Sequence, residues 1–108
     1  MAKKIIYTAD APAPIGPYSQ AVQSGDLLFV SGQIAIEPAS GDLVTSSIED
    51  ETKQVMKNIQ AIIAAAGTDF ANVIKCSIFL QDMNNFPKVN DIYGQYFQAD
   101  PPARETVE

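Results

Sequence analysis

The chain has 108 residues, a length that suits one domain and is too short for two. Seven basic against thirteen acidic residues give a net charge of −6. This charge argues against a nucleic-acid partner and against an anionic membrane surface, because both require a basic face. The absence of histidine excludes a Ser-His-Asp triad, and one cysteine with scattered carboxylates makes no metal site.

The single cysteine, Cys76, also excludes a disulfide within the chain. No long apolar run follows Lys3 and Lys4, so we find no secretion signal, and no stretch approaches the length of a membrane span. We therefore expect a reducing, cytoplasmic location.

The N-terminal part of the chain predicts three short strands. A strand pattern over residues 4–8 precedes an irregular, proline-rich segment over residues 9–17. Residues 21–23 and 26–34 then predict two strands around a turn at Ser24-Gly25-Asp26. Because the run from Leu27 to Val30 is apolar on both faces, we expect it to lie in a central strand.

The strongest helical pattern runs from Ile48 to Ala66. Ser46 or Ser47 can cap this helix, acidic residues follow in its first turn, and Gly67 ends it. Its predicted buried face consists of Val55, Ile59, Ile62, Ile63 and Ala66.

The C-terminal part predicts a strand, a helix and a last strand. Residues 73–81 alternate between apolar and polar side chains, and Pro87 suits the first turn of a second helix. That helix places Val89, Ile92, Tyr93, Tyr96 and Phe97 at helical spacing, and residues 103–108 start the last strand. This order of elements predicts an α+β fold in which two helices pack on one face of a mixed sheet. The other face is left to solvent or to a partner.

Four segments of the chain carry recognisable motifs: IGPYSQAV at 15–22, FVSGQI at 29–34, FLQDMNNFPKVNDIY at 79–93 and PPARETVE at 101–108. Together they resemble the Rid family, the reactive intermediate deaminases. The resemblance implies one chorismate-mutase-like domain over residues 1–108, a homotrimer, and clefts between adjacent subunits. It also implies hydrolysis of 2-iminobutanoate and 2-iminopropanoate to 2-keto acids and ammonia, without a cofactor.

The same resemblance assigns the site residues. Arg104 would hold the substrate carboxylate, for which a guanidinium is geometrically matched, and the Thr106 backbone carbonyl would face the imine nitrogen. Tyr18 would lie in the cleft. Four further residues would contact the substrate: Ser31, Gly32, Asn90 and Phe86.

Each of these residues also has a purely structural interpretation. Arg104 taken alone is more often part of a surface salt bridge, and Tyr18 can be a packing aromatic with a solvated hydroxyl. Ser31 and Gly32 can simply end a strand, Asn90 can be a solvated helix position, and Phe86 can be a packing residue. Cys76 alternates with apolar residues, so we interpret it as a small buried hydrophobe and not as a nucleophile.

The chain departs from the family pattern in two ways. Many relatives have a cysteine where Thr106 stands, which is harmless if only the backbone carbonyl acts. Relatives also continue into a final strand that carries a glutamate thought to orient the water, and neither Glu105 nor Glu108 matches its motif. We therefore expect these 108 residues to be an incomplete functional polypeptide, slow in catalysis without that strand.

Three other functions compete with imine deamination. The chain can be a non-catalytic protein that binds a small carboxylate in the Arg104 cleft. A nuclease or translation inhibitor is harder to reconcile with the missing histidines and the net charge of −6. A chaperone-like role, also attributed to relatives, stays open.

Overall fold

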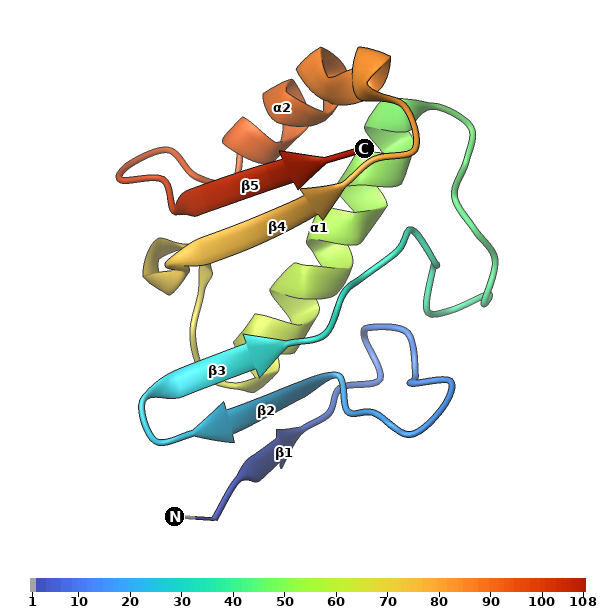
Figure 1. Cartoon of the computed structure of the whole chain (residues 1–108). Helices are drawn as coiled ribbons and strands as arrows, with labels where there is room; N and C mark the ends of the chain where they lie inside the picture. The colour runs from blue at the N-terminus through green and yellow to red at the C-terminus, as the bar shows by residue number, and fades with distance from the viewer. Residues whose placement is uncertain (1) are drawn as a thin grey trace.

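The computed structural model describes residues 2–108, and its strands form two hydrogen-bonded sheets. Strands β1 (Lys4–Ile6), β2 (Ala21–Ser24) and β3 (Leu27–Val30) form an antiparallel sheet in that order. Strands β4 (Lys75–Phe79) and β5 (Ala103–Val107) pair in parallel. Figure 1 shows the two sheets next to each other, with β3 and β4 as the neighbouring strands.

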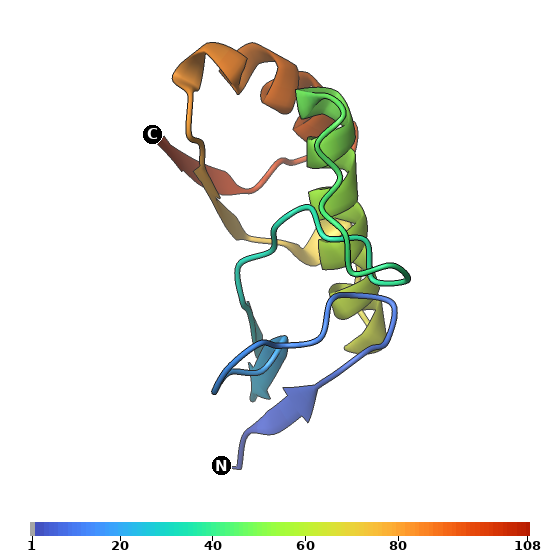
Figure 2. The same cartoon turned by 90° about the vertical axis from the view of Figure 1, so that its right-hand side faces the viewer.

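Both α-helices lie on the same side of the strands, as Figure 2 shows. They are α1 (Ile48–Ala65) and α2 (Phe86–Gly94), and they are accompanied by two single-turn 3₁₀-helices, η1 (Phe70–Asn72) and η2 (Met83–Asn85). The Ser47 hydroxyl caps α1 by accepting a hydrogen bond from the Asp50 N–H at 3.0 Å. Gly67 follows the helix at φ +84°, a conformation that favours glycine. The α+β fold with two helices on one face is confirmed.

The core joins the antiparallel sheet to α1. Its central cluster consists of Ile6, Ala11, Ala21 and Ile62, all of them buried. The predicted face of α1 is confirmed at Ile62 and Ile63, whereas Val55 and Ile59 are only half-buried. The smaller helix α2 buries Val89, Ile92 and Tyr93, which ties the second sheet to the rest of the molecule.

Two buried amides explain why the strands are shorter than predicted. The Gln20 side chain, 1% exposed, accepts a hydrogen bond from the Thr8 N–H and donates one to the Thr8 carbonyl, so Thr8 leaves β1. The Asn58 side chain, also 1% exposed, donates to the carbonyls of Ile34 and Ile36 at 3.1 and 2.9 Å. The chain after Val30 is therefore fastened to α1 and does not continue β3, since buried backbone groups need partners.

The expectation of a central, doubly buried strand at Leu27 to Val30 is wrong for the single chain. β3 lies at the edge of its sheet. Leu28 packs against the core, whereas Leu27 and Phe29 are 52% and 62% exposed. The reason is that successive side chains of a strand point to opposite faces and that both helices cover the same face.

Candidate active site

Arg104, the only arginine of the chain, lies near the beginning of β5. In the parallel pairing with β4 it stands opposite Cys76, so both side chains leave the sheet on the same face. Cys76 is half-buried and its thiol is free, whereas Arg104 is exposed. The sheet thus carries the guanidinium to the border between strands and solvent, where a ligand can reach it.

The side chains that surround the guanidinium belong to one face of α2. Asn90 Oδ1 accepts a hydrogen bond from Arg104 Nη1 at 2.7 Å. The ring centroids of Phe86 and Tyr93 each lie 5.1 Å from Arg104 Cζ, within the range of a cation–π interaction. These helix residues follow one another at spacings of four and three, which puts them on one face of α2. The structure therefore brings together three of the predicted residues: Arg104, Asn90 and Phe86.

The guanidinium has no carboxylate partner within residues 2–108. The salt bridge found in this part of the chain joins Lys75 to Glu105 on the opposite face of the β4–β5 sheet, at 3.7 Å. Arg104 consequently keeps a full positive charge that the protein does not neutralise by direct contact. The structural alternative, a surface salt bridge of Arg104, is not found within residues 2–108.

The main chain of β5 turns alternate residues toward and away from β4. The Ala103 N–H donates to Ile74, and the Val107 carbonyl accepts from Leu80. Because successive residues of a strand direct their N–H and C=O groups to opposite edges, those of Arg104 and Thr106 point to the other edge of β5. The Thr106 carbonyl therefore lies on the edge that no strand within residues 2–108 covers, on the strand that carries Arg104.

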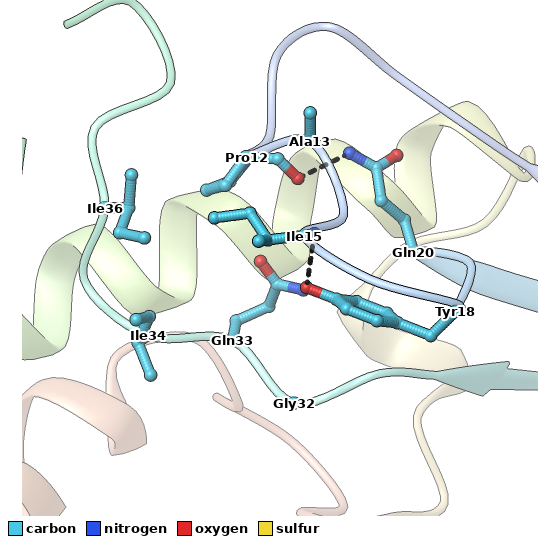
Figure 3. A pocket seen from close by; sticks show the side chains of 9 residues that line it. All are labelled: Pro12, Ala13, Ile15, Tyr18, Gln20, Gly32, Gln33, Ile34 and Ile36. Carbon is cyan, nitrogen blue, oxygen red and sulfur yellow. Dashed lines mark hydrogen bonds between the residues drawn. The ribbon is translucent and has the colours of Figure 1, made fainter. Parts of the chain in front are cut away.

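Tyr18 and Gly32 belong to a different place, a small cavity of about 110 Å³ (Figure 3). The Tyr18 hydroxyl accepts a hydrogen bond from the Ile15 N–H at 3.3 Å, and the ring is half-exposed. Ser31 does not line this cavity, since its hydroxyl donates to the Ser19 carbonyl at 2.7 Å. The cavity is smaller than a usual ligand pocket of roughly 300–1,000 Å³, so by itself it offers only part of a binding site.

We call Arg104 with Asn90, Phe86 and Tyr93 the Arg104 group, and Tyr18 with the other residues that line its cavity the Tyr18 group. The two groups do not contact each other within one chain. In Figure 1, β5 begins at the left of the view, whereas the loop before β2 lies at the right. No hydrogen bond joins the two groups among the described residues, and the residues that line the Tyr18 cavity all come from positions 12–36. One chain therefore presents two separate groups of predicted site residues.

Sequence reasoning missed two residues, Tyr93 and Gln20. The helical spacing predicts Tyr93 as a packing residue of the second helix, and it is indeed buried, but its ring also faces Arg104. Its position three residues after Asn90 on the same helix was the available signal. Gln20 fixes the loop that carries Tyr18, and no local pattern identified it.

The Tyr93 hydroxyl is buried and has no hydrogen-bond partner within residues 2–108. Burial, reinforced by the neighbouring Cys76 thiol, holds the pKa of Tyr93 well above its ordinary value, and the Arg104 charge offsets this only in part. Tyr93 is therefore neutral at physiological pH and supplies no counter-charge to the guanidinium.

Known proteins resemble this chain in both sequence and structure. A family model described as Endoribonuclease L-PSP matches residues 8–108. A solved structure of a Rid family protein from Yersinia pestis is 47% identical with a TM-score of 0.94, covering 99% of this chain and 85% of that one. The chain belongs to the Rid family. The family expected from the four sequence segments is confirmed.

Two other members of the Rid family bear on function. The 2-iminobutanoate/2-iminopropanoate deaminase of Bos taurus is 52% identical over 108 residues, which is 100% of this chain and 79% of the relative. A crystal structure of E. coli TdcF with bound serine is 39% identical with a TM-score of 0.92, covering 96% of this chain and 84% of that one. The enzyme class expected for this Rid chain, 2-iminobutanoate/2-iminopropanoate deaminase, is the one that appears in the names of such relatives.

No helix within residues 2–108 is long and apolar enough to cross a membrane. The same residues contain no group of three or more cysteine, aspartate or glutamate side chains arranged to hold a metal ion.

Proposed function

We propose that this Rid protein hydrolyses 2-imino acids, namely 2-iminobutanoate and 2-iminopropanoate, to 2-keto acids and ammonia. The observation that carries the proposal is the Arg104 guanidinium, which is exposed and has no carboxylate partner within residues 2–108. A 2-imino acid has a carboxylate next to the reactive carbon. Binding that carboxylate would bring the C=N group to the free edge of β5. The names of the mammalian relatives support the same substrates.

In the proposed reaction, the protein acts mainly by positioning the substrate. Two N–H groups of Arg104 bind the carboxylate, and the Thr106 carbonyl accepts a hydrogen bond from the protonated imine nitrogen. Water adds to the C=N bond, its oxygen to carbon and a proton to nitrogen. The carbon–nitrogen bond then breaks with its electron pair going to nitrogen, so that ammonia leaves, and the hydroxyl proton passes to solvent water as the keto C=O bond forms. Imines hydrolyse in water without a catalyst, so orientation and polarisation by these two groups suffice for an acceleration, and no cofactor is invoked.

We further propose that the complete cleft forms between two subunits of a homotrimer. The Arg104 group and the Tyr18 group stand at opposite ends of the strands, so a cleft that uses both takes them from different copies. The sheet face away from the helices supports self-association, because it exposes large apolar side chains from both sheets: Ile5, Leu27, Phe29, Phe79 and Val107. A monomer in light scattering at micromolar concentration would exclude this arrangement.

The second candidate function is a non-catalytic receptor for a small carboxylate. The bound serine in TdcF favours it, since serine carries the same carboxylate group next to an amine-bearing carbon. Arg104 would serve such a receptor equally well. RNA cleavage, which the family model's description names, is less favoured, because the chain has no histidine and a net charge of −6.

We place the protein in the cytoplasm, without nucleic-acid or membrane partners. Its free, half-buried Cys76 suits a reducing compartment. Because its net charge is negative, a small anionic ligand is expected to bind only at Arg104.

The test is direct hydrolysis of a freshly formed imine. An amino acid oxidase generates 2-iminobutanoate, and semicarbazide captures whatever imine has not yet hydrolysed. The protein should lower semicarbazone formation and speed the release of keto acid and ammonia, and Arg104→Ala should abolish the effect. If wild-type protein binds 2-oxobutanoate but leaves the hydrolysis rate unchanged, the receptor function replaces the deaminase.

A further inference from the structure

The contacts of the Arg104 guanidinium share one property: every one of them is with a neutral group. They are the amide oxygen of Asn90 and the rings of Phe86 and Tyr93. The chain has thirteen acidic residues against a single arginine, yet none forms a salt bridge with it within residues 2–108. Even Asp91, the neighbour of Asn90 on α2, is exposed and makes no such contact.

We propose that Asn90 and Tyr93 are positioning residues that hold the Arg104 guanidinium through neutral contacts alone. This leaves its charge and its remaining N–H groups to the substrate carboxylate. The inference rests on the proposed function and adds to it two residues that act through Arg104. In this role Asn90 needs no contact of its own with the substrate.

The Asn90 contact fixes the guanidinium without competing for it. A guanidinium has five N–H donors, and the single bond at 2.7 Å to Asn90 Oδ1 uses one of them. A carboxylate at the same position would form a charge-assisted pair with Arg104 and would take the place of the substrate carboxylate. Asparagine and aspartate have nearly the same shape, so exchanging them changes charge and little else.

The Tyr93 contact restrains the guanidinium from the core side. The ring is only 7% exposed and belongs to the packed face of α2, so it forms a fixed surface next to Arg104. Only the ring takes part, because the hydroxyl lies beside Cys76 and has no hydrogen-bond partner within residues 2–108. The hydroxyl is therefore dispensable for this role, whereas the aromatic ring is not.

The Asn90→Asp variant tests the neutral contact. We expect a rise of about tenfold to a hundredfold in the KM for 2-iminobutanoate and in the Kd for 2-oxobutanoate, with kcat within about threefold of wild type. The melting temperature should not fall, because the new ion pair stabilises the fold. The matched control is Asn84→Asp, which adds the same charge at an exposed residue outside this cluster and should leave the KM unchanged.

Unchanged affinity in Asn90→Asp would overturn the inference, as would a loss of affinity accompanied by a falling melting temperature, which would reveal a merely structural role.

Tyr93 is tested by comparing two substitutions. Tyr93→Leu should raise the KM by about threefold to thirtyfold through loss of the cation–π contact, and Tyr93→Phe should restore it to within about threefold of wild type. Equal effects of leucine and phenylalanine would contradict the role of the ring.

A third measurement separates this inference from the proposed function. Because Arg104 is the only arginine, its guanidinium signals in an NMR spectrum need no assignment by mutation. Without any ligand, the two rings should shift its Hδ and Hε signals upfield, and Tyr93→Leu and Asn90→Ala should move them toward free-arginine values. Shifted signals without imine hydrolysis would reject the deaminase function alone. Hydrolysis with signals of a free side chain would reject the positioning role alone.

Discussion

At the scale of single residues, the proposed chemistry of this Rid protein depends mainly on one side chain. Arg104 is the sole arginine, it is exposed, and its known contacts leave most of its donors free. Lysine carries the same charge but lacks the planar, two-pronged donor geometry that matches a carboxylate.

Arg104→Lys should therefore lower kcat/KM for 2-iminobutanoate by about tenfold to a hundredfold, and Arg104→Ala by at least as much. Steady-state kinetics with semicarbazide as the competitor measures the effect. Circular dichroism and light scattering verify that each variant keeps the wild-type fold and assembly. Wild-type turnover in a folded Arg104→Ala protein would show that another group holds the substrate.

The opposite face of the same sheet has its own charged pair, which should not affect catalysis. The Ser77 hydroxyl donates to Glu105 Oε1 at 2.6 Å, and this bond, together with the charge of Lys75, holds the pKa of Glu105 below its ordinary value. A lowered folded-state pKa means that the associated stabilisation is present above the unfolded pKa and is lost as pH falls through the folded one. Since Glu105 is exposed to solvent, we expect only a small effect on unfolding.

Ser77→Ala should accordingly raise the pKa of Glu105 toward its ordinary value, while Lys75 retains part of the shift. An NMR titration of the Glu105 side-chain carboxyl carbon in both proteins measures this. Identical titration midpoints would show that the hydroxyl does not hold the carboxylate in solution.

At the scale of elements, helix α1 fixes one wall of the Tyr18 cavity. Asn58 on α1 binds the carbonyls of Ile34 and Ile36, two residues that line the Tyr18 cavity. From the other side, Gln20 binds the carbonyl of Pro12, which lines the same cavity (Figure 3). Two buried amides thus hold two walls of this cavity.

Asn58→Leu should destabilise the fold by about 2–4 kcal/mol, because it leaves two backbone carbonyls without partners in a buried place. Chemical denaturation measures the free energy of unfolding. Gln54→Leu is the matched control: it removes the hydrogen bond from Gln54 to Asn58 and leaves both carbonyl contacts, so its effect should stay under about 1 kcal/mol. An Asn58→Leu protein as stable as the control would contradict this role.

At the scale of the whole molecule, the proposed cleft that uses both the Arg104 group and the Tyr18 group would take them from two copies of the chain. The helices cover one face of the strands, and the other face exposes Phe29 and Phe79, 62% and 76% accessible. Burying such a face between subunits would also strengthen a domain of this small size.

Mixing two inactive variants tests whether each cleft uses two subunits. If Arg104 and Tyr18 come from adjacent copies, trimers formed by joint refolding of equal amounts of Arg104→Ala and Tyr18→Ala should regain about a quarter of the wild-type sites, since one interface in four combines two intact residues. The imine assay on the mixture, with each variant alone as control, measures the recovery. No recovery in confirmed mixed trimers would place both residues in a cleft of one subunit.

The sequence by itself determined the order and type of the elements and the family, and it predicted Arg104 as the leading candidate for the site. These conclusions rest on local features: the helical spacing through Ile62 and Ile63, the alternation around Cys76, the glycine that ends α1, and short contiguous motifs such as PPAR. Such features act over short stretches of chain, so a pattern of residues reveals them without knowledge of the rest.

Only the tertiary structure decided the strand ends, the exposure of β3, the contact of Tyr93 with Arg104, and the separation of the Tyr18 group from the Arg104 group. Each of these depends on segments distant in sequence. Gln20 and Asn58 take backbone groups from strands that the local pattern would have continued, and the packing of both helices on one face leaves Phe29 exposed. The physical reason is that side-chain hydrogen bonds and packing across the fold override local propensity wherever they bury a polar group or cover a face.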